Sequence, residues 1–276
     1  MSHPPILING VRDRNPVLVL RHISNLRVIA MGDSSVFGVG DQGDAIPSVG
    51  AGWAGRVAHD LGVARFLNVA KNGARARHIV KHQLNAAVAF NPHLVLMCIG
   101  TNDVLRGDFS KEEIRSSLTE VIERLRDSKS VLVLLGLPDP IKTAPGPLSL
   151  RKILATRVQV VNSVLMELAA DHNLVFVPTW HSRIAHERRM WHVDRMHPSA
   201  LGHQHIADLV RRHLSLPRRS KKKLPTQSTS SRSFELYWLI TNGAKWFAKR
   251  SIDLVPALIW LVISENFQRK ARSKRR

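Results

Sequence analysis

"LRVIAMGDSSVFG", residues 26–38, is the stretch of sequence that most clearly indicates the fold. Its first half is an almost unbroken apolar run that ends in Gly32, which is typical of a strand buried on both faces of a parallel sheet. Asp33 and Ser34 follow that strand directly. Either these two residues cap the next segment, or Ser34 is a nucleophile held at the end of a strand. The loops elsewhere in the chain distinguish between these two hypotheses.

Apolar runs and amphipathic segments alternate along the chain. The runs have the length of strands, and the segments between them carry apolar residues at helical spacing. This alternation predicts an α/β fold in which a five-stranded parallel sheet is covered by helices on both faces. The predicted strands are 26–32, 64–70, 93–100, 130–136 and 174–178, and the predicted helices are 52–62, 75–89, 110–127, 149–171 and 199–214.

The charge is unevenly distributed along the chain. Residues 217–276 hold 15 Lys or Arg and 3 Asp or Glu, a net charge of +12, whereas residues 1–216 hold 26 and 18, a net charge of +8. Residues 217–233 are basic and rich in Ser, Thr and Pro without a hydrophobic period, which indicates a flexible linker. We therefore expect one catalytic-size domain over 1–216, a linker over 217–233 and a separate segment over 234–276.

Polar residues follow the predicted strands at the point where each strand ends. Ligands of parallel α/β sheets bind at the carboxyl ends of the strands, so these loops should meet at one edge. Together the loops supply a hydroxyl, an imidazole, a carboxylate, a side-chain amide and backbone N–H groups. The stretches concerned are Gly32 to Ser34, Asn72 to Gly73, "GTND" at 100–103 and "DRMH" at 194–197.

Acyl transfer needs this set of groups. Ser34 would attack the acyl carbon, His197 would act first as base and then as acid, and Asp194 would orient His197. The backbone N–H groups of Ser34 and Gly73 and the side-chain amide of Asn102 would hold the oxyanion. Each residue taken alone is better explained as a turn or cap residue. Their joint occurrence on loops at one sheet edge favours catalysis.

These pieces, in this order, resemble the SGNH or GDSL-type hydrolases. The resemblance covers roughly residues 27–214, and Asp194 matches the family's Asp-x-x-His motif. It implies a three-layer α/β/α, flavodoxin-like fold and the hydrolysis, sometimes the transfer, of ester-linked acyl groups. The four letters of the family name correspond to Ser34, Gly73, Asn102 and His197.

Other motifs indicate neither a cofactor nor a metal. "GVGDQG" at 38–43 has the spacing of a dinucleotide-binding loop, but it begins past the strand and does not run into a helix. "HERRM" at 186–190 lacks the second histidine of a zinc-protease helix, and His78 with His82 lacks a third ligand. We therefore expect no cofactor and no metal site.

The segment 234–276 is apolar, aromatic and basic at once. Its apolar run 254–263 is too short to span a bilayer, whereas its tryptophans and basic residues suit a helical, amphipathic tail on an anionic membrane surface. Docking on the domain or on a second subunit is the alternative, and nucleic acid is the least favoured partner. The oligomeric state is open.

A single cysteine, Cys98, and the absence of a secretory apolar region near the N-terminus predict a cytoplasmic protein, peripheral to the inner face of the membrane if the tail binds lipid. We expect a serine esterase or lipase-like hydrolase that acts on a small-molecule or lipid ester. An acyltransferase or deacetylase acting on a sugar or lipid is the nearest alternative. A non-catalytic lipid- or nucleic-acid-binding member of the fold is the other.

Overall fold

The computed structural model describes residues 6–8, 11–13, 20, 23–41, 52–144, 147–179, 184–217 and 263. Apart from residues 217 and 263, the predicted linker 217–233 and the predicted tail 234–276 lie outside these residues. The domain boundaries therefore stay predictions.

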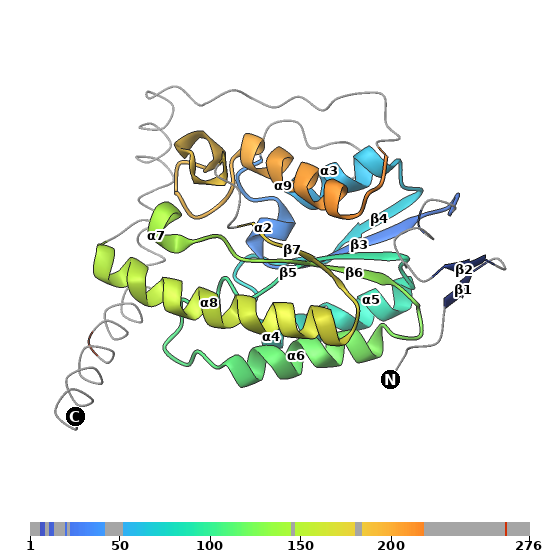
Figure 1. The fold of residues 1–276 in the computed structure, drawn as a ribbon, viewed down its shortest axis with the longest axis horizontal. Helices are drawn as coiled ribbons and strands as arrows, with labels where there is room; N and C mark the ends of the chain where they lie inside the picture. The colour runs from blue at the N-terminus through green and yellow to red at the C-terminus, as the bar shows by residue number, and fades with distance from the viewer. Residues whose placement is uncertain are drawn as a thin grey trace.

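A five-stranded sheet runs through the middle of the domain (Figure 1). Its order is β4-β3-β5-β6-β7, and each pair of neighbours is parallel. Gly32 at the end of one strand lies opposite Cys98 at the end of the next, so the loops that follow leave the sheet at the same edge. The strands are β3 (Arg27–Gly32), β4 (Arg65–Asn68), β5 (Leu94–Cys98), β6 (Val131–Leu135) and β7 (Val175–Val177).

Helices cover both faces of the sheet (Figure 1). The paired helices α3 (Gly52–Leu61) and α9 (Ala200–His213) form one layer. All residues of β5 and β6 are buried between the two layers, so the core lies along the centre of the sheet. The three-layer α/β/α fold predicted from the sequence is confirmed. The other layer consists of α4 (Ala76–His82), α5 (Leu84–Phe90), α6 (Lys111–Arg124) and α8 (Leu148–Asp171).

Helix α8 is long and apolar enough to cross a membrane, but 56% of its most apolar window is buried inside the domain. Its buried face, which includes Val161, Leu165 and Leu168, packs into the main hydrophobic core. We therefore assign α8 to the core of the domain.

The predicted helix 75–89 is two helices, and Gln83 separates them. The buried Gln83 side chain donates to the carbonyl of Gly32 at 2.9 Å and accepts from the Gly32 N–H at 2.8 Å. Gln83 therefore anchors the end of β3 from the neighbouring layer. Further short elements were not predicted from the sequence: β1 (Ile6–Ile8), β2 (Val11–Asp13), α2 (Ser34–Phe37), α7 (Pro140–Thr143), η1 (Ile184–His186) and η2 (Arg188–Met190).

Candidate active site

Ser34 is the first residue of α2, directly after β3. Asp33 caps this short helix, because its Oδ1 accepts from the backbone N–H of Ser35 at 2.9 Å and from the Ser35 hydroxyl at 2.8 Å. A Cβ at Gly32 would lie 2.2 Å from the carbonyl oxygen of Cys98, so a side chain cannot be placed there. Burial raises the pKa of the Asp33 carboxyl, and its bonds to Ser35 partly offset that rise. Capping therefore falls to Asp33, and the Ser34 hydroxyl is available to another partner.

That partner is His197. Its Nε2 lies 2.8 Å from Ser34 Oγ, and its Nδ1 lies 2.8 Å from Asp194 Oδ2. If Nδ1 carries the proton that it shares with Asp194, Nε2 is the acceptor for the serine proton. The structure thus places these three side chains in one hydrogen-bonded chain, although Ser34 and His197 are 163 residues apart.

The Asp194 carboxylate is held in its ionised form. Burial alone would raise the pKa of Asp194, but the neighbouring imidazoles of His192 and His197 and the backbone N–H of Met196 hold it well below its usual range. Its second oxygen, Oδ1, accepts from the backbone N–H groups of Met196 at 2.9 Å and of His197 at 3.1 Å. Asp194 is therefore a fixed negative charge beside the imidazole at neutral pH.

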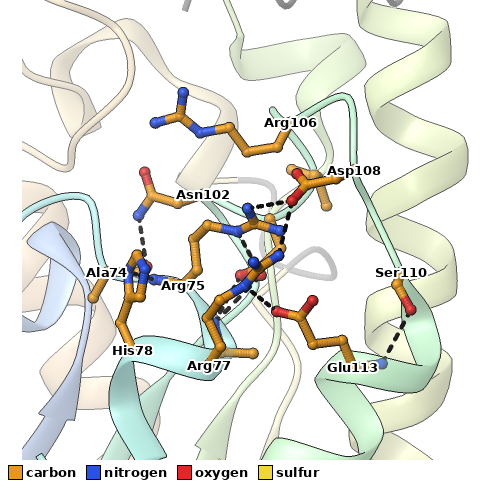
Figure 2. A network of polar contacts seen from close by, with 12 residues as sticks. Ala74, Arg75, Arg77, His78, Asn102, Arg106, Asp108, Ser110 and Glu113 are labelled. Carbon is orange, nitrogen blue, oxygen red and sulfur yellow. Dashed lines mark hydrogen bonds and ion pairs between the residues drawn. The ribbon is translucent and has the colours of Figure 1, made fainter. Parts of the chain in front are cut away.

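The predicted oxyanion donors lie on the loops that follow β4 and β5. Asn102 Nδ2 donates one of its two N–H groups to the carbonyl of Ala74 at 3.0 Å, which fixes the amide and leaves the second N–H for a ligand (Figure 2). Gly73 has φ +77°, in the left-handed region that a tight turn needs. Among the described residues, the N–H groups of Ser34 and Gly73 have no hydrogen-bond acceptor. The turn at 71–74 is tied to β3, since Lys71 N donates to Gly32 O at 3.1 Å.

Next to these donors lies the α4–α6 network, which we define as Arg75, Arg77, Asp103, Asp108 and Glu113. Figure 2 shows Arg75 and Arg77 with Asp108 and Glu113. The buried Asp103 accepts from the Ala76 N–H at 3.2 Å and from Arg75 Nε at 3.3 Å. Burial raises the pKa of Asp103, and the charge of Arg75 partly offsets the rise. Arg75 and Arg77 both donate to Asp108, at 3.0 and 2.8 Å, and Arg77 donates to Glu113 at 2.5 Å.

On the opposite side of the sheet lies the α3–α9 network, which we define as Asp41, Arg56, His203 and Gln204. The Arg56 guanidinium binds both oxygens of Asp41, at 2.8 and 2.9 Å, and donates to Gln204 Oε1 at 2.9 Å. Asp41 also accepts from the N–H of Gly52 at 3.1 Å. This network joins helix α9 to the turn that follows the Ser34 helix.

His203 makes that connection directly. Its Nδ1 accepts from the backbone N–H of Trp53 at 3.1 Å, and its Nε2 donates to the carbonyl of Val39 at 2.9 Å. Full burial lowers the pKa of His203 to about 4. His203 is therefore a neutral structural histidine at pH 7.

The sequence predicted the side chains that meet at the site but not those that hold them. Gln83 and Arg56 belong to no recognisable motif and read as ordinary positions on polar helix faces, and Asp41 lies in the "GVGDQG" stretch, whose spacing indicates a different use. Gln83 binds Gly32, 51 residues away, and Arg56 binds Asp41 and Gln204, 15 and 148 residues away, so local spacing could not indicate these partners. Within the described part of the chain, no three His, Cys, Asp or Glu side chains are grouped so that they could hold a metal ion.

Comparison with known proteins gives one family and a set of similar folds. A model of the "GDSL-like Lipase/Acylhydrolase family" matches residues 30–205. None of the curated proteins searched matches the chain.

Three solved structures illustrate the similarity of fold. A catalytic mutant of an acetylxylan esterase from Geobacillus stearothermophilus has a TM-score of 0.60 at 17% identity, covering 73% of this chain and 100% of its own. An α/β hydrolase from the metagenome of Lake Arreo, Spain, has a TM-score of 0.56 at 20% identity, covering 71% and 98%. Phospholipase A1 from Streptomyces albidoflavus has a TM-score of 0.54 at 20% identity, covering 69% and 100%. At these identities the likeness concerns the fold.

Proposed function

The chain belongs to the GDSL-like lipase/acylhydrolase family, and from this premise we propose that it hydrolyses carboxylic esters through an acyl-enzyme on Ser34. The observation that carries the proposal is the chain of two 2.8 Å contacts from Ser34 Oγ through His197 to Asp194. A serine hydroxyl is a weak nucleophile until a positioned base takes its proton. His197 Nε2 is in place for that transfer.

The first half of the reaction forms the acyl-enzyme. Ser34 Oγ attacks the ester carbonyl while its proton passes to His197 Nε2, and Asp194 stabilises the imidazolium that results. The oxyanion accepts hydrogen bonds from the N–H groups of Ser34 and Gly73 and from the Asn102 amide. As the tetrahedral intermediate collapses, the C–O bond breaks and His197 returns its proton to the leaving alcohol.

The second half releases the acid. Water attacks the acyl-serine carbonyl while His197 Nε2 takes its proton, and the same donors hold the second oxyanion. When the intermediate collapses, Ser34 Oγ leaves and recovers its proton from His197. An alcohol in place of water would give acyl transfer by the same steps.

Ester turnover tests the proposal. Wild-type protein should hydrolyse p-nitrophenyl acetate, and Ser34→Ala should lower kcat/KM by at least about 10³-fold, as loss of the nucleophile does in other serine hydrolases. Ser35→Ala is the matched control, because it removes a hydroxyl one residue away that contacts Asp33 and not His197. Equal turnover by the wild type and Ser34→Ala would contradict the proposal.

A further inference from the structure

Asp194 has a second histidine beside it. His192 Nδ1 lies 3.3 Å from Asp194 Oδ2, the same oxygen that His197 Nδ1 contacts at 2.8 Å. The side chain of His192 is 16% exposed and that of Asp194 is 6% exposed, so water screens this contact only weakly. Two imidazole nitrogens thus face one carboxylate oxygen, and His197 has the shorter contact.

The backbone fixes the place of His192. Its N–H donates to the carbonyl of His197 at 2.8 Å, and Arg188 Nη1 donates to its carbonyl at 3.1 Å. On the other side, a Cβ at Gly40 would lie 2.1 Å from the carbonyl oxygen of Pro198 and 3.2 Å from His192 Cβ. Because Gly40 has no side chain, the turn after α2 packs against this loop. The approach of His192 to Asp194 is therefore built into the fold.

The contact between His192 Nδ1 and Asp194 Oδ2 indicates which nitrogen of His192 is protonated. An unprotonated nitrogen would repel a carboxylate at 3.3 Å, so the distance favours a hydrogen on Nδ1 of His192. We propose that His192 is a positioning residue, whose Nδ1–H shares Asp194 with His197 and limits how strongly the carboxylate stabilises the protonated base. The inference rests on the proposed function of the site, because it concerns the base of that reaction.

Electrostatics gives the direction in which His192 changes the stabilisation of protonated His197. A donor on Asp194 spreads part of the carboxylate charge, so the His197 imidazolium is stabilised less than by an unshared carboxylate. Removing the donor leaves the whole charge for His197, which then holds its proton to higher pH. If His192 is itself cationic, its removal also ends a repulsion and acts in the same direction.

Other titratable groups surround the pair, and each stays unchanged in the test. Arg188 from η2 contacts the His192 carbonyl, and Arg195 lies between Asp194 and His197 in the loop. Asp33 from the β3 end and the buried His203 from α9 both act electrostatically on His197. Of the groups around Asp194, only His192 is changed in the variants that test the inference.

The pH profile of kcat/KM tests the inference. The acid limb reports protonation of the base in the unbound enzyme. In His192→Leu its midpoint should move upward by about half a unit to one unit. In His192→Asn, whose amide nitrogen stands where Nδ1 stood, the midpoint should stay near that of the wild type. His213→Leu, on an exposed histidine in the last turn of α9, is the control for loss of a histidine. An unmoved limb in His192→Leu, or equal shifts in the Leu and Asn variants, would overturn the inference.

A second measurement needs neither turnover nor a variant. Two-dimensional ¹H–¹⁵N NMR of the wild-type imidazoles at pH 7 should show a hydrogen on Nδ1 of His192 as well as on Nδ1 of His197. An unprotonated Nδ1 on His192 would overturn the inference even if the enzyme is active. Conversely, a protein without esterase activity that shows both Nδ1 hydrogens contradicts the proposed function and leaves the shared carboxylate in place.

Discussion

The two networks beside the candidate site hold their loops in different ways. In the α3–α9 network, the ion pair of Arg56 and Asp41 is almost fully buried, with side chains 4% and 3% exposed. In the α4–α6 network, the ion pair of Arg77 and Asp108 is open to solvent, with side chains 44% and 58% exposed. The first network positions the Ser34 and His197 loops, and the second lies behind the oxyanion donors.

The difference in burial predicts which side of the site is more sensitive to substitution. A buried ion pair that loses one partner leaves an uncompensated charge, whereas an exposed pair exchanges its partner for water. The nucleophile side of the site should therefore fail by unfolding, and the oxyanion side should tolerate loss of its outer charges. Single substitutions test this contrast.

The largest effect is expected from Arg56→Met. It leaves the buried Asp41 with only the Gly52 N–H as a described partner, and breaking a buried pair in this way costs about 3 to 5 kcal/mol. Urea unfolding measures the loss. Arg126→Met, on an exposed arginine, is the control, and a midpoint for Arg56→Met close to that of the control would show that the pair is not a structural anchor.

Gln83→Leu should have the next largest effect. It leaves the buried N–H of Gly32 without its partner, which costs about 1 to 3 kcal/mol, whereas the Gly32 carbonyl keeps its hydrogen bond from Lys71 N. Because Gly32 directly precedes Asp33 and Ser34, kcat should fall together with stability. Gln83→Glu keeps an acceptor for the Gly32 N–H, but it buries a carboxylate and turns the donor that faces the Gly32 carbonyl into a second oxygen, so it should not restore the wild-type stability at pH 7. Normal activity of Gln83→Leu would mean that β3 ends correctly without this amide.

The buried His203 predicts that the free energy of unfolding depends on pH. Burial lowers its pKa to about 4 from 6.5, so between these values the unfolded chain binds more protons than the folded protein. Acidification through this window therefore lowers the free energy of unfolding, by up to about 1.4 kcal/mol per pH unit from this group.

His203→Gln removes the titrating group and keeps a polar side chain. Urea unfolding of the variant and the wild type, measured at several pH values from 7 to 4, should give curves that converge as the pH falls. Parallel curves would show that His203 does not titrate in this window.

The smallest effect is expected from Arg77→Ala on the opposite side. Its partners Asp108 and Glu113 are exposed or half-buried, and Arg75 still contacts Asp108. We expect no measurable change in the urea midpoint. A loss as large as that of Arg56→Met would remove the contrast between the two networks.

The sequence predicted the fold well because its strongest signals are local. Apolar runs such as 94–98 and 131–135 are buried along their whole length, which is what their composition indicates. Ser110 caps α6 by accepting from the Glu113 N–H at 3.1 Å, as the Ser-x-x-Glu pattern predicts. The break at Gln83 could not be predicted, because nothing in a helical pattern marks a glutamine whose partner is a distant strand end.

In the site too, local pattern and topology could be predicted from the sequence, whereas long-range packing could not. Ser34, His197 and Asp194 could be placed together because parallel topology brings the ends of their strands to one edge. The role of Asp33 as the cap, and therefore the separation of capping from the Ser34 hydroxyl, needed side-chain geometry. The two networks and the approach of His192 to Asp194 depend on long-range packing that spacing does not encode.

Covalent labelling is the most direct test that Ser34 is the activated nucleophile. A fluorophosphonate reacts with a serine that a histidine base activates, so wild-type protein should gain one phosphonyl adduct that peptide mapping places on Ser34. Ser34→Ala should remain unlabelled, His197→Ala should label far more slowly, and Ser35→Ala should label as the wild type does. A folded wild-type protein that stays unlabelled, or that carries its adduct on a residue other than Ser34, would show that Ser34 is not the activated nucleophile.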